Sequence, residues 1–185
     1  MILLTTSLLA ASLAGQDSPP RLDTQYEASV AHPFGQPNPD APAELAQFGF
    51  FIGEFACVDE RFLPDGSSVR FNAIWNGHYF LNGHAIQDQY WAPGFYTSNI
   101  RQFDEATGEW KVHFLSEPGY STGVWSGGLD GDDMVLTRDV QTPNGTAVSR
   151  LTFYEITEDG FRWRGQTVAG ETITTGWTSD CTRVR

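Results

Sequence analysis

Turn signals recur along the chain from Phe51 to Arg185, and short runs of alternating or aromatic-rich residues lie between them. No run between these signals has the pattern of a long amphipathic helix. Strands separated by turns at roughly every 10–15 residues are typical of antiparallel barrels and sandwiches. The chain is therefore expected to be all-β. The turn signals are Pro64-Asp65-Gly66, Asn76-Gly77, Pro93-Gly94, Ala106-Thr107-Gly108, Pro118-Gly119, Asp130-Gly131-Asp132, Pro143-Asn144-Gly145, Asp159-Gly160 and Ala169-Gly170.

The composition suits a single β domain with many aromatic side chains. The 185 residues include 13 Phe, 6 Trp and 6 Tyr but only 2 Met, and wide, flat side chains pack well on the half-buried faces of strands. A chain of this length is expected to form one domain with a sizeable core. The formal net charge of -12 repels phosphate groups, so neither nucleic acid nor an anionic membrane surface is an expected partner.

The N-terminal residues 1–14 form an apolar run that ends in Ser12-Leu13-Ala14. Ser12 and Ala14 place small residues at the two positions that a signal peptidase reads. The run is shorter than the ~20 residues needed to span a bilayer. We therefore predict a signal peptide over residues 1–14 and a periplasmic or secreted protein without a membrane span; a merely apolar tail is the alternative.

Residues 15–43 are rich in Pro, Gln, Asp and Ser, which is typical of a disordered or loosely draped leader. Near its end, Asp40 is a candidate helix cap, Pro42 suits a first helical turn and Glu44 favours a helix N-terminus. A short helix over about residues 41–48 is therefore expected to lead into the first strand and to plug one end of a barrel. The folded domain is assigned to residues 44–185.

The two cysteines lie in the first and last predicted strands, which are neighbours in a closed antiparallel barrel of even strand number. If Cys57 and Cys181 lie directly opposite each other, export makes a disulfide possible. Two reduced, buried thiols that never meet are the alternative. The same register pairs Phe55 with Arg183, Asp59 with Ser179, and Arg61 with Trp177. Two of these pairs set an arginine against an aromatic ring, which is a favourable cation–π contact.

Two parts of the sequence resemble known families. Gly53-Glu54-Phe55, set against Arg183, is similar to the calycin arrangement in which a Gly-x-Trp packs under an arginine; this chain has Phe at the Trp position. The segment from Ile74 to Leu81, followed by Asp104 to Trp110 with its Ala106-Thr107-Gly108 turn, resembles the exported bacterial barrels of domain-of-unknown-function family 1579. The resemblance covers roughly residues 45–185. It implies a lipocalin-like, up-and-down barrel of roughly eight to ten strands, and it assigns no activity.

No motif for metal binding, a cofactor or nucleophilic catalysis stands out. His78 and His84 end a repeated Asn-Gly-His triplet, but on one continuous strand they would lie ~20 Å apart and could not bind one metal. Asn76-Gly77 before His78 is better explained as a hairpin corner. His113 is expected on the face opposite its apolar neighbours. HExxH, CxxC, Gly-x-Ser-x-Gly and phosphate-binding glycine loops are all missing from the sequence, so no metal, cofactor or catalytic residue is predicted.

The candidate ligand-binding residues are aromatic or histidine side chains within strand-like runs. A barrel cavity lined by aromatic rings with a few polar groups is a common way to hold a small ligand. Arginines on central strands, such as Arg101, Arg150, Arg162 and Arg164, are individually expected to face solvent. The predicted lining residues are Trp75, Tyr79, His84, Tyr90, Trp125 and Trp163; core packing is the alternative for each.

These observations predict a barrel that binds or carries a small apolar or amphipathic molecule. An enzyme that uses the cavity as its active site, such as a hydrolase or isomerase, is a second possibility. A structural or interaction protein with a side-chain-filled barrel is a third. Cavity volume separates the third from the other two, because a barrel of about eight strands can be packed or hollow. The ligand and the oligomeric state are left open.

Overall fold

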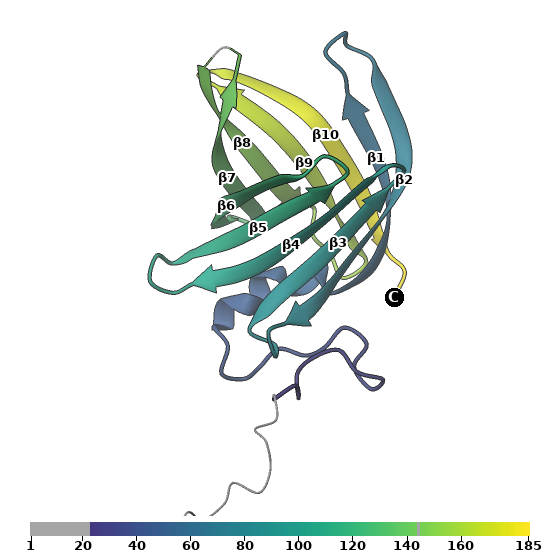
Figure 1. The fold of residues 1–185 in the computed structure, drawn as a ribbon, viewed down its shortest axis with the longest axis vertical. Coiled ribbons are helices and arrows are strands. Elements are labelled where there is room, and N and C mark those ends of the chain that lie inside the picture. Colours follow the sequence, from purple (N-terminus) through teal and green to yellow (C-terminus); the bar gives the residue numbers. More distant parts are fainter. Residues whose placement is uncertain (1–22, 144) are drawn as a thin grey trace, which may run out of the picture.

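The computed structural model describes residues 23–143 and 145–185. Ten antiparallel strands, each joined to the next by a hairpin turn, form a closed barrel in which the last strand pairs with the first (Figure 1). This confirms the all-β, up-and-down prediction. A 3-10 helix, η1 (Ala43–Phe51), precedes the barrel. The strands are β1 (Gly53–Phe62), β2 (Ser68–Phe80), β3 (Ala85–Ala92), β4 (Phe95–Asp104), β5 (Glu109–Glu117), β6 (Ser121–Asp130), β7 (Asp133–Thr142), β8 (Gly145–Tyr154), β9 (Gly160–Ala169) and β10 (Thr172–Arg183).

Barrel closure follows the predicted register. Cys57 pairs with Cys181 across β1 and β10, with Cα atoms 4.1 Å apart and a disulfide between them. Phe55 faces Arg183, Asp59 faces Ser179 and Arg61 faces Trp177 in the same ladder. A buried disulfide is typical of proteins from oxidising compartments.

Arg183 ties the closing strand to the helix end of the barrel. Its guanidinium carbon lies 4.7 Å from the centroid of the Phe55 ring. The same guanidinium donates to the carbonyl oxygen of Phe50, at 2.9 Å, and to that of Ile52. Arg183 thereby holds the C-terminal end of η1, whose last carbonyls have no partner within the helix. The expected calycin-like packing of Phe55 under Arg183 is confirmed.

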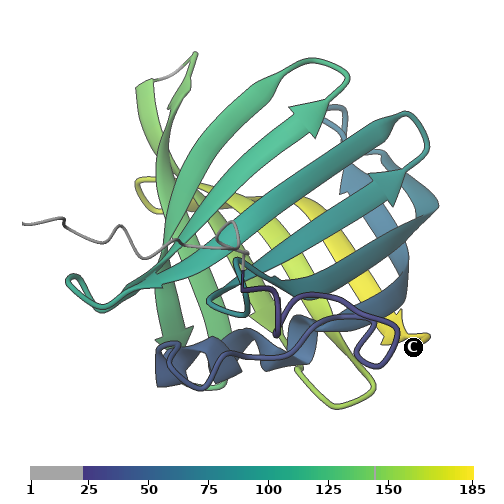
Figure 2. The same cartoon turned by 60° about the horizontal axis from the view of Figure 1, so that its bottom comes forward.

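Helix η1 closes one end of the barrel, as Figure 2 shows. Leu45, Phe48 and Phe51 are its buried residues. The helix runs over Ala43–Phe51, slightly later than the predicted residues 41–48. Asp40 does not cap it, because the helix begins at Ala43 and Asp40 lies before its N-cap position. The N-cap residue is Pro42, which makes no side-chain capping bond.

The predicted turn at Asn76-Gly77 is wrong: β2 continues to Phe80, and the chain turns at the second Asn-Gly pair of the repeat instead. A Cβ atom at Gly77 would lie 2.3 Å from the carbonyl oxygen of Phe51. The glycine therefore lets the end of η1 approach the strand, and it marks a close backbone contact where a turn was expected.

The described part of the leader contacts the end of β2 and the turn between β2 and β3. The Tyr79 N–H donates to the Phe34 carbonyl at 2.8 Å, and the Asn38 N–H donates to the Gly83 carbonyl at 3.0 Å. A Cβ atom at Gly83 would lie 2.5 Å from the Gln36 carbonyl oxygen. The absence of a side chain at this turn therefore allows the leader to pack there.

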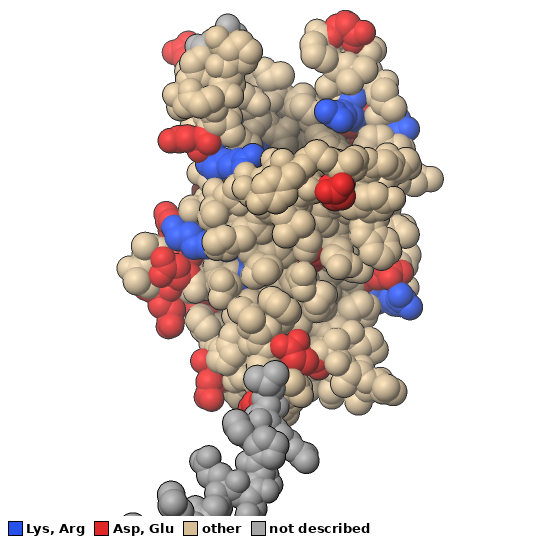
Figure 3. Space-filling view, in the orientation of Figure 1, with Lys and Arg blue, Asp and Glu red and all other residues tan. Residues whose placement is uncertain are grey.

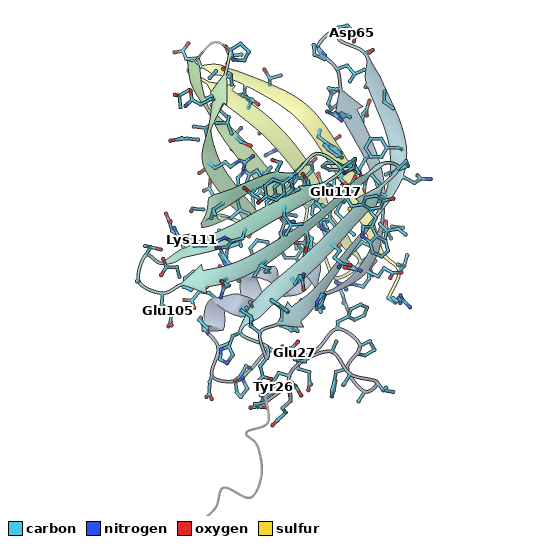
Figure 4. All side chains as sticks on the ribbon, in the orientation of Figure 1. Tyr26, Glu27, Asp65, Glu105, Lys111 and Glu117 are labelled. Atoms are coloured by element: carbon cyan, nitrogen blue, oxygen red, sulfur yellow. A yellow bond between two sulfur atoms is a disulfide. The ribbon has the colours of Figure 1, made fainter. Side chains whose placement is uncertain are left out.

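Tyr26 and Glu27 of the leader lie below the barrel, at the same end as η1 (Figure 4). Residues 1–22, which include the predicted signal peptide and the first part of the leader, lie outside the described residues. No helix among the described residues is long and apolar enough to cross a membrane.

The outer surface over β3, β4 and β5 is largely uncharged (Figure 3). Trp91, Tyr96 and Leu115 are each about half exposed on these strands, at 47%, 50% and 52%. Trp91 and Tyr96 are direct partners in the β3–β4 ladder. His113, on β5, is exposed as its alternation with Val112 predicts.

Candidate functional site

A cavity of about 200 Å³ lies inside the barrel. All ten strands contribute side chains to its wall, because alternate residues of each strand point inward. The lining is mostly aromatic and aliphatic, with a few polar groups among the rings. The lining residues are Asp59, Trp75, Tyr90, Phe95, Thr97, Asn99, Arg101, Val112, Phe114, Trp125, Leu136, Leu151, Phe153, Trp163 and Trp177.

Four of the six predicted lining residues lie together at this cavity: Trp75, Tyr90, Trp125 and Trp163. Tyr79 and His84 do not line it. Tyr79 lies on the same inward-facing side of β2 as Trp75. Phe51 of the helix packs on Gly77, between the two residues, and thereby separates Tyr79 from the cavity. His84 lies in the turn after β2 and is exposed.

Sequence reasoning missed the polar part of the site. Arg101 was expected to face solvent, yet it is 2% exposed and lines the cavity. The alternation of inward and outward side chains along each strand, counted from the cysteines, could have identified part of this polar group. Asp59 lies two residues after Cys57, and Trp177 lies four residues before Cys181, so a disulfide inside the barrel places both on the inner face.

Asp59 is a buried carboxylate that accepts three hydrogen bonds. Its Oδ2 accepts from the Tyr90 hydroxyl at 2.6 Å and from the Trp177 indole N–H at 2.7 Å. Its Oδ1 accepts from the Ser179 hydroxyl at 2.6 Å. Burial raises the pKa of Asp59, and these three donors oppose the rise. In the described part of the chain, no arginine, lysine or histidine forms an ion pair with this carboxylate.

Tyr90 keeps its proton beside Asp59. Burial is the main cause that raises the pKa of the Tyr90 hydroxyl, and the hydrogen bond to Asp59 adds to it. The hydroxyl is therefore a permanent donor at physiological pH. Trp177 can only donate as well. Together with Ser179, these donors stabilise the negative charge of the Asp59 carboxylate itself.

Asp88 is the second buried carboxylate, and it has a cationic partner. Its Oδ1 accepts from the Trp75 indole N–H at 3.0 Å and from the Asn99 side-chain amide at 2.8 Å, while Oδ2 pairs with Arg101. Burial raises the pKa of Asp88 and lowers that of Arg101, whereas their mutual attraction opposes both shifts. Because a guanidinium stays protonated in proteins, the two groups form a buried ion pair.

The Arg101 guanidinium lies within a cage of phenylalanine rings above the helix. Its central carbon is 4.6 Å from the ring centroid of Phe51, 5.1 Å from that of Phe48 and 5.8 Å from that of Phe153. Such contacts attract the cation to the ring faces. Arg101 therefore joins the helix, the ion pair and the floor of the cavity.

Three buried N–H donors of cavity-lining residues have no hydrogen-bond partner within the described structure: Arg101 Nε, Trp125 Nε1 and Trp163 Nε1. A buried donor without a partner costs ~1–3 kcal/mol. In folded proteins, most buried donors of this kind are paired with protein atoms or with water. The ring of Trp125 is covered by the Arg138 guanidinium, 3.7 Å from its centroid.

A groove of about 410 Å³ lies next to the cavity, at the end of the barrel away from η1. It is lined by the β1–β2 turn and by residues of β8, β9 and β10. Figure 3 shows a notch at this end, between the β1–β2 and β7–β8 hairpins. Trp163 and Trp177 line both the groove and the inner cavity. Their ring centroids are 6.1 Å apart, so these two rings form the boundary between the two spaces.

The described residues bring no three His, Cys, Asp or Glu side chains together in an arrangement that could hold a metal ion. The cavity wall consists instead of aromatic and aliphatic side chains with one carboxylate, Asp59, and one guanidinium, Arg101, which is paired with Asp88. This composition suits the binding of an organic molecule.

Comparisons with known proteins address the fold. No protein-family model matches the chain, and no curated protein matches it. The structure is similar to that of Rv2717c from M. tuberculosis, with a TM-score of 0.56 and 13% sequence identity over 79% of this chain and 100% of that chain. It is also similar to the S-type phycobiliprotein lyase CPES from Guillardia theta, with a TM-score of 0.48 and 13% identity over 78% and 98% of the two chains. Membership of family 1579 stays a prediction, and the fold is that of a calycin-like barrel.

Proposed function

We propose that the protein binds a small organic molecule, about the size of one aromatic ring with a short substituent, in the barrel cavity. The observation that carries this proposal is a cavity of about 200 Å³ with aromatic walls and a few fixed polar groups. An apolar cavity of about 150 Å³ is large enough to bind benzene. The available volume therefore favours ligands of this size over long fatty acids or retinoids.

The polar groups support an amphipathic ligand over a purely apolar one. Asp59 offers a carboxylate at the cavity wall, and Thr97 and Asn99 add polar side chains to it. A few polar groups within an apolar lining are the usual source of orientation and specificity. A packed barrel with only a structural role would require the interior to be filled, and the cavity volume argues against that alternative.

The neighbouring groove supports a route of entry. Trp163 and Trp177 line both the groove and the cavity, so the groove leads to the cavity wall. The opposite end is closed by η1 and its buried phenylalanines. A ligand would therefore enter from the end that includes the β1–β2 turn.

The predicted signal peptide and the disulfide both support a periplasmic or secreted location. In that setting, binding or carrying a small molecule outside the cytoplasm is the role that the fold and the cavity support best.

The proposal is tested with a panel of ring-sized compounds: benzylamine, benzyl alcohol, benzoate and indole. Binding is followed by isothermal titration calorimetry and by tryptophan emission, because Trp75, Trp125, Trp163 and Trp177 all line the cavity. At least one compound is expected to bind with an emission change.

A pair of variants locates the binding site. Val112→Phe adds a ring to the cavity wall, whereas Val124→Phe adds the same ring on the exposed face of β6. Val112→Phe should weaken binding at least tenfold, and Val124→Phe should leave it unchanged. If no compound binds, or if Val112→Phe binds as well as the wild type, the cavity is not a ligand site.

A further inference from the structure

Asp59 lacks a countercharge although it is 1% exposed. Its hydrogen-bond partners Tyr90, Trp177 and Ser179 are all neutral. Arg61 is near, but its guanidinium lies over the Trp177 ring, 5.7 Å from the centroid, and makes no ion pair with Asp59. Buried charges are normally paired, because an isolated ion in an apolar environment is strongly unfavourable.

Aromatic rings surround the space beside Asp59. We call them the aromatic box, and neighbouring centroids within it are 5.4–6.4 Å apart. The faces of such rings carry negative potential, and grouped rings attract organic cations such as quaternary ammonium groups. The members of the aromatic box are Trp75, Tyr90, Phe95, Trp163 and Trp177.

The barrel already contains one complete example of this arrangement. Asp88 pairs with Arg101, and the guanidinium lies among the rings of Phe48, Phe51 and Phe153. The Asp59 site has the same two components, a buried carboxylate and a set of rings, but none of the described residues supplies the cation. The charge of Arg101 at the cavity wall is matched by Asp88 behind it, so an ionised Asp59 has no opposite charge of its own among the described residues.

We infer that the ligand is an organic cation, an amine or quaternary ammonium group on a small apolar body, with its nitrogen beside Asp59 and its body within the aromatic box. This inference rests on the proposed function and names the chemical class of its ligand. A cation completes the charge pairing of Asp59, whereas an anion would be repelled by it. The overall charge of -12 also raises the local concentration of cations around the protein.

The first experiment compares compounds of the same size but different charge. The wild type should bind benzylamine, which is protonated at neutral pH, roughly tenfold or more tightly than benzyl alcohol, and benzoate least of all. Asp59→Asn should remove this preference. Asp139→Asn is the matched control, because it removes the same charge from an exposed position on β7, and it should keep the preference.

The second experiment uses the wild type alone, so it does not depend on the folding of a variant. Tetramethylammonium has the same charge at every pH. Its affinity should fall as the pH is lowered from about 8 to about 4, because protonation removes the charge of Asp59, whose pKa burial raises. Among the groups that hydrogen-bond to this carboxylate, Tyr90 stays protonated, and Trp177 and Ser179 are neutral.

The outcomes separate the two proposals. If benzyl alcohol or benzoate binds as tightly as benzylamine, or if Asp59→Asn keeps the preference, the cation inference is overturned while the cavity remains a ligand site. An affinity for tetramethylammonium that does not change with pH would overturn it as well. If no compound of the panel binds, both the proposed function and the inference fail.

Discussion

The buried pair of Asp88 and Arg101 provides a direct test of how the cavity floor is stabilised. Arg101→Met keeps an unbranched apolar side chain of similar length, but it leaves the Asp88 carboxylate, which is 0% exposed, without its cation. Breaking a buried ion pair in this way costs ~3–5 kcal/mol. For a chain of this size, that loss corresponds to a fall of about 6–20 °C in melting temperature.

The loss of stability in Arg101→Met should depend on pH. Removing Arg101 leaves burial as the dominant influence on Asp88, so the pKa of Asp88 in the folded variant lies further above its unfolded value. The folded variant then binds a proton more readily than the unfolded chain. The contribution of Asp88 to the stability of the variant is therefore greatest at low pH and is lost as the pH rises through that raised pKa. The deficit relative to wild type should therefore be larger at about pH 7 than at about pH 4.

Urea denaturation followed by tryptophan fluorescence measures both effects. Asp88→Asn combined with Arg101→Met should recover most of the loss, because the amide oxygen still accepts from Trp75 and Asn99 while the charge is gone. Arg162→Met is the surface control. Its side chain is 46% exposed, and the change should stay within about 0.5 kcal/mol. A loss below about 1 kcal/mol for Arg101→Met, or a loss that grows at low pH, would refute the reasoning.

Two further predictions concern the helix contact and the closing strands. Gly77→Ala forces a Cβ atom against the Phe51 carbonyl and should destabilise the fold by ~1–3 kcal/mol in urea denaturation. Gly128→Ala is the control, because the space around Gly128 is open, and it should be neutral or slightly stabilising. Equal effects of the two substitutions would contradict the close contact at Gly77. Replacing both Cys57 and Cys181 by Ala removes a cross-link between residues 124 apart in the sequence. The free energy of unfolding should fall by ~4–5 kcal/mol on the chain-entropy model. An unchanged urea midpoint would argue against that contribution.

The register at the barrel closure could be predicted because two independent constraints meet there. Side chains alternate strictly along a strand, so one fixed pair determines every other pair in the ladder. Cys57 and Cys181 supplied that fixed pair, and the contacts of Phe55 with Arg183 and of Arg61 with Trp177 followed. Within the central strands, hairpin turns fix the register, but only the alternation of polar and apolar residues indicates which face is buried.

That alternation is misleading along β4. Phe95, Thr97, Asn99 and Arg101 share one parity and all line the cavity. The rule that polar residues face solvent in an antiparallel sheet therefore assigns Arg101 to the wrong face. Its partner Asp88 lies on the neighbouring strand, diagonally across the β3–β4 ladder. The predicted turn at Pro93-Gly94 fixes that register, but the turn alone does not say which face of the sheet is buried.

The sequence also does not predict how far along the barrel axis each inward-facing side chain lies. Parity correctly places Trp75 and Tyr79 on one face of β2, but it does not say where the helix crosses the barrel. The position of Phe51 against Gly77 decides that Trp75 lies above the helix at the cavity and that Tyr79 lies beside the leader. Asn76-Gly77 resembled a turn because glycine serves both tight turns and close backbone contacts.

The two ends of the barrel differ in how their aromatic side chains are used. At the helix end, Phe51, Phe55 and Phe161 pack ring against ring, with centroids 5.1–6.2 Å apart, and they have no polar edge to satisfy. Away from the helix, Tyr90 and Trp177 direct their polar edges at Asp59. Because the phenylalanine layer fills the barrel interior near η1, that layer can stabilise the fold while the other end stays hollow. Loss of Asp59 should therefore affect ligand choice more than folding, whereas loss of Arg101 should affect folding first.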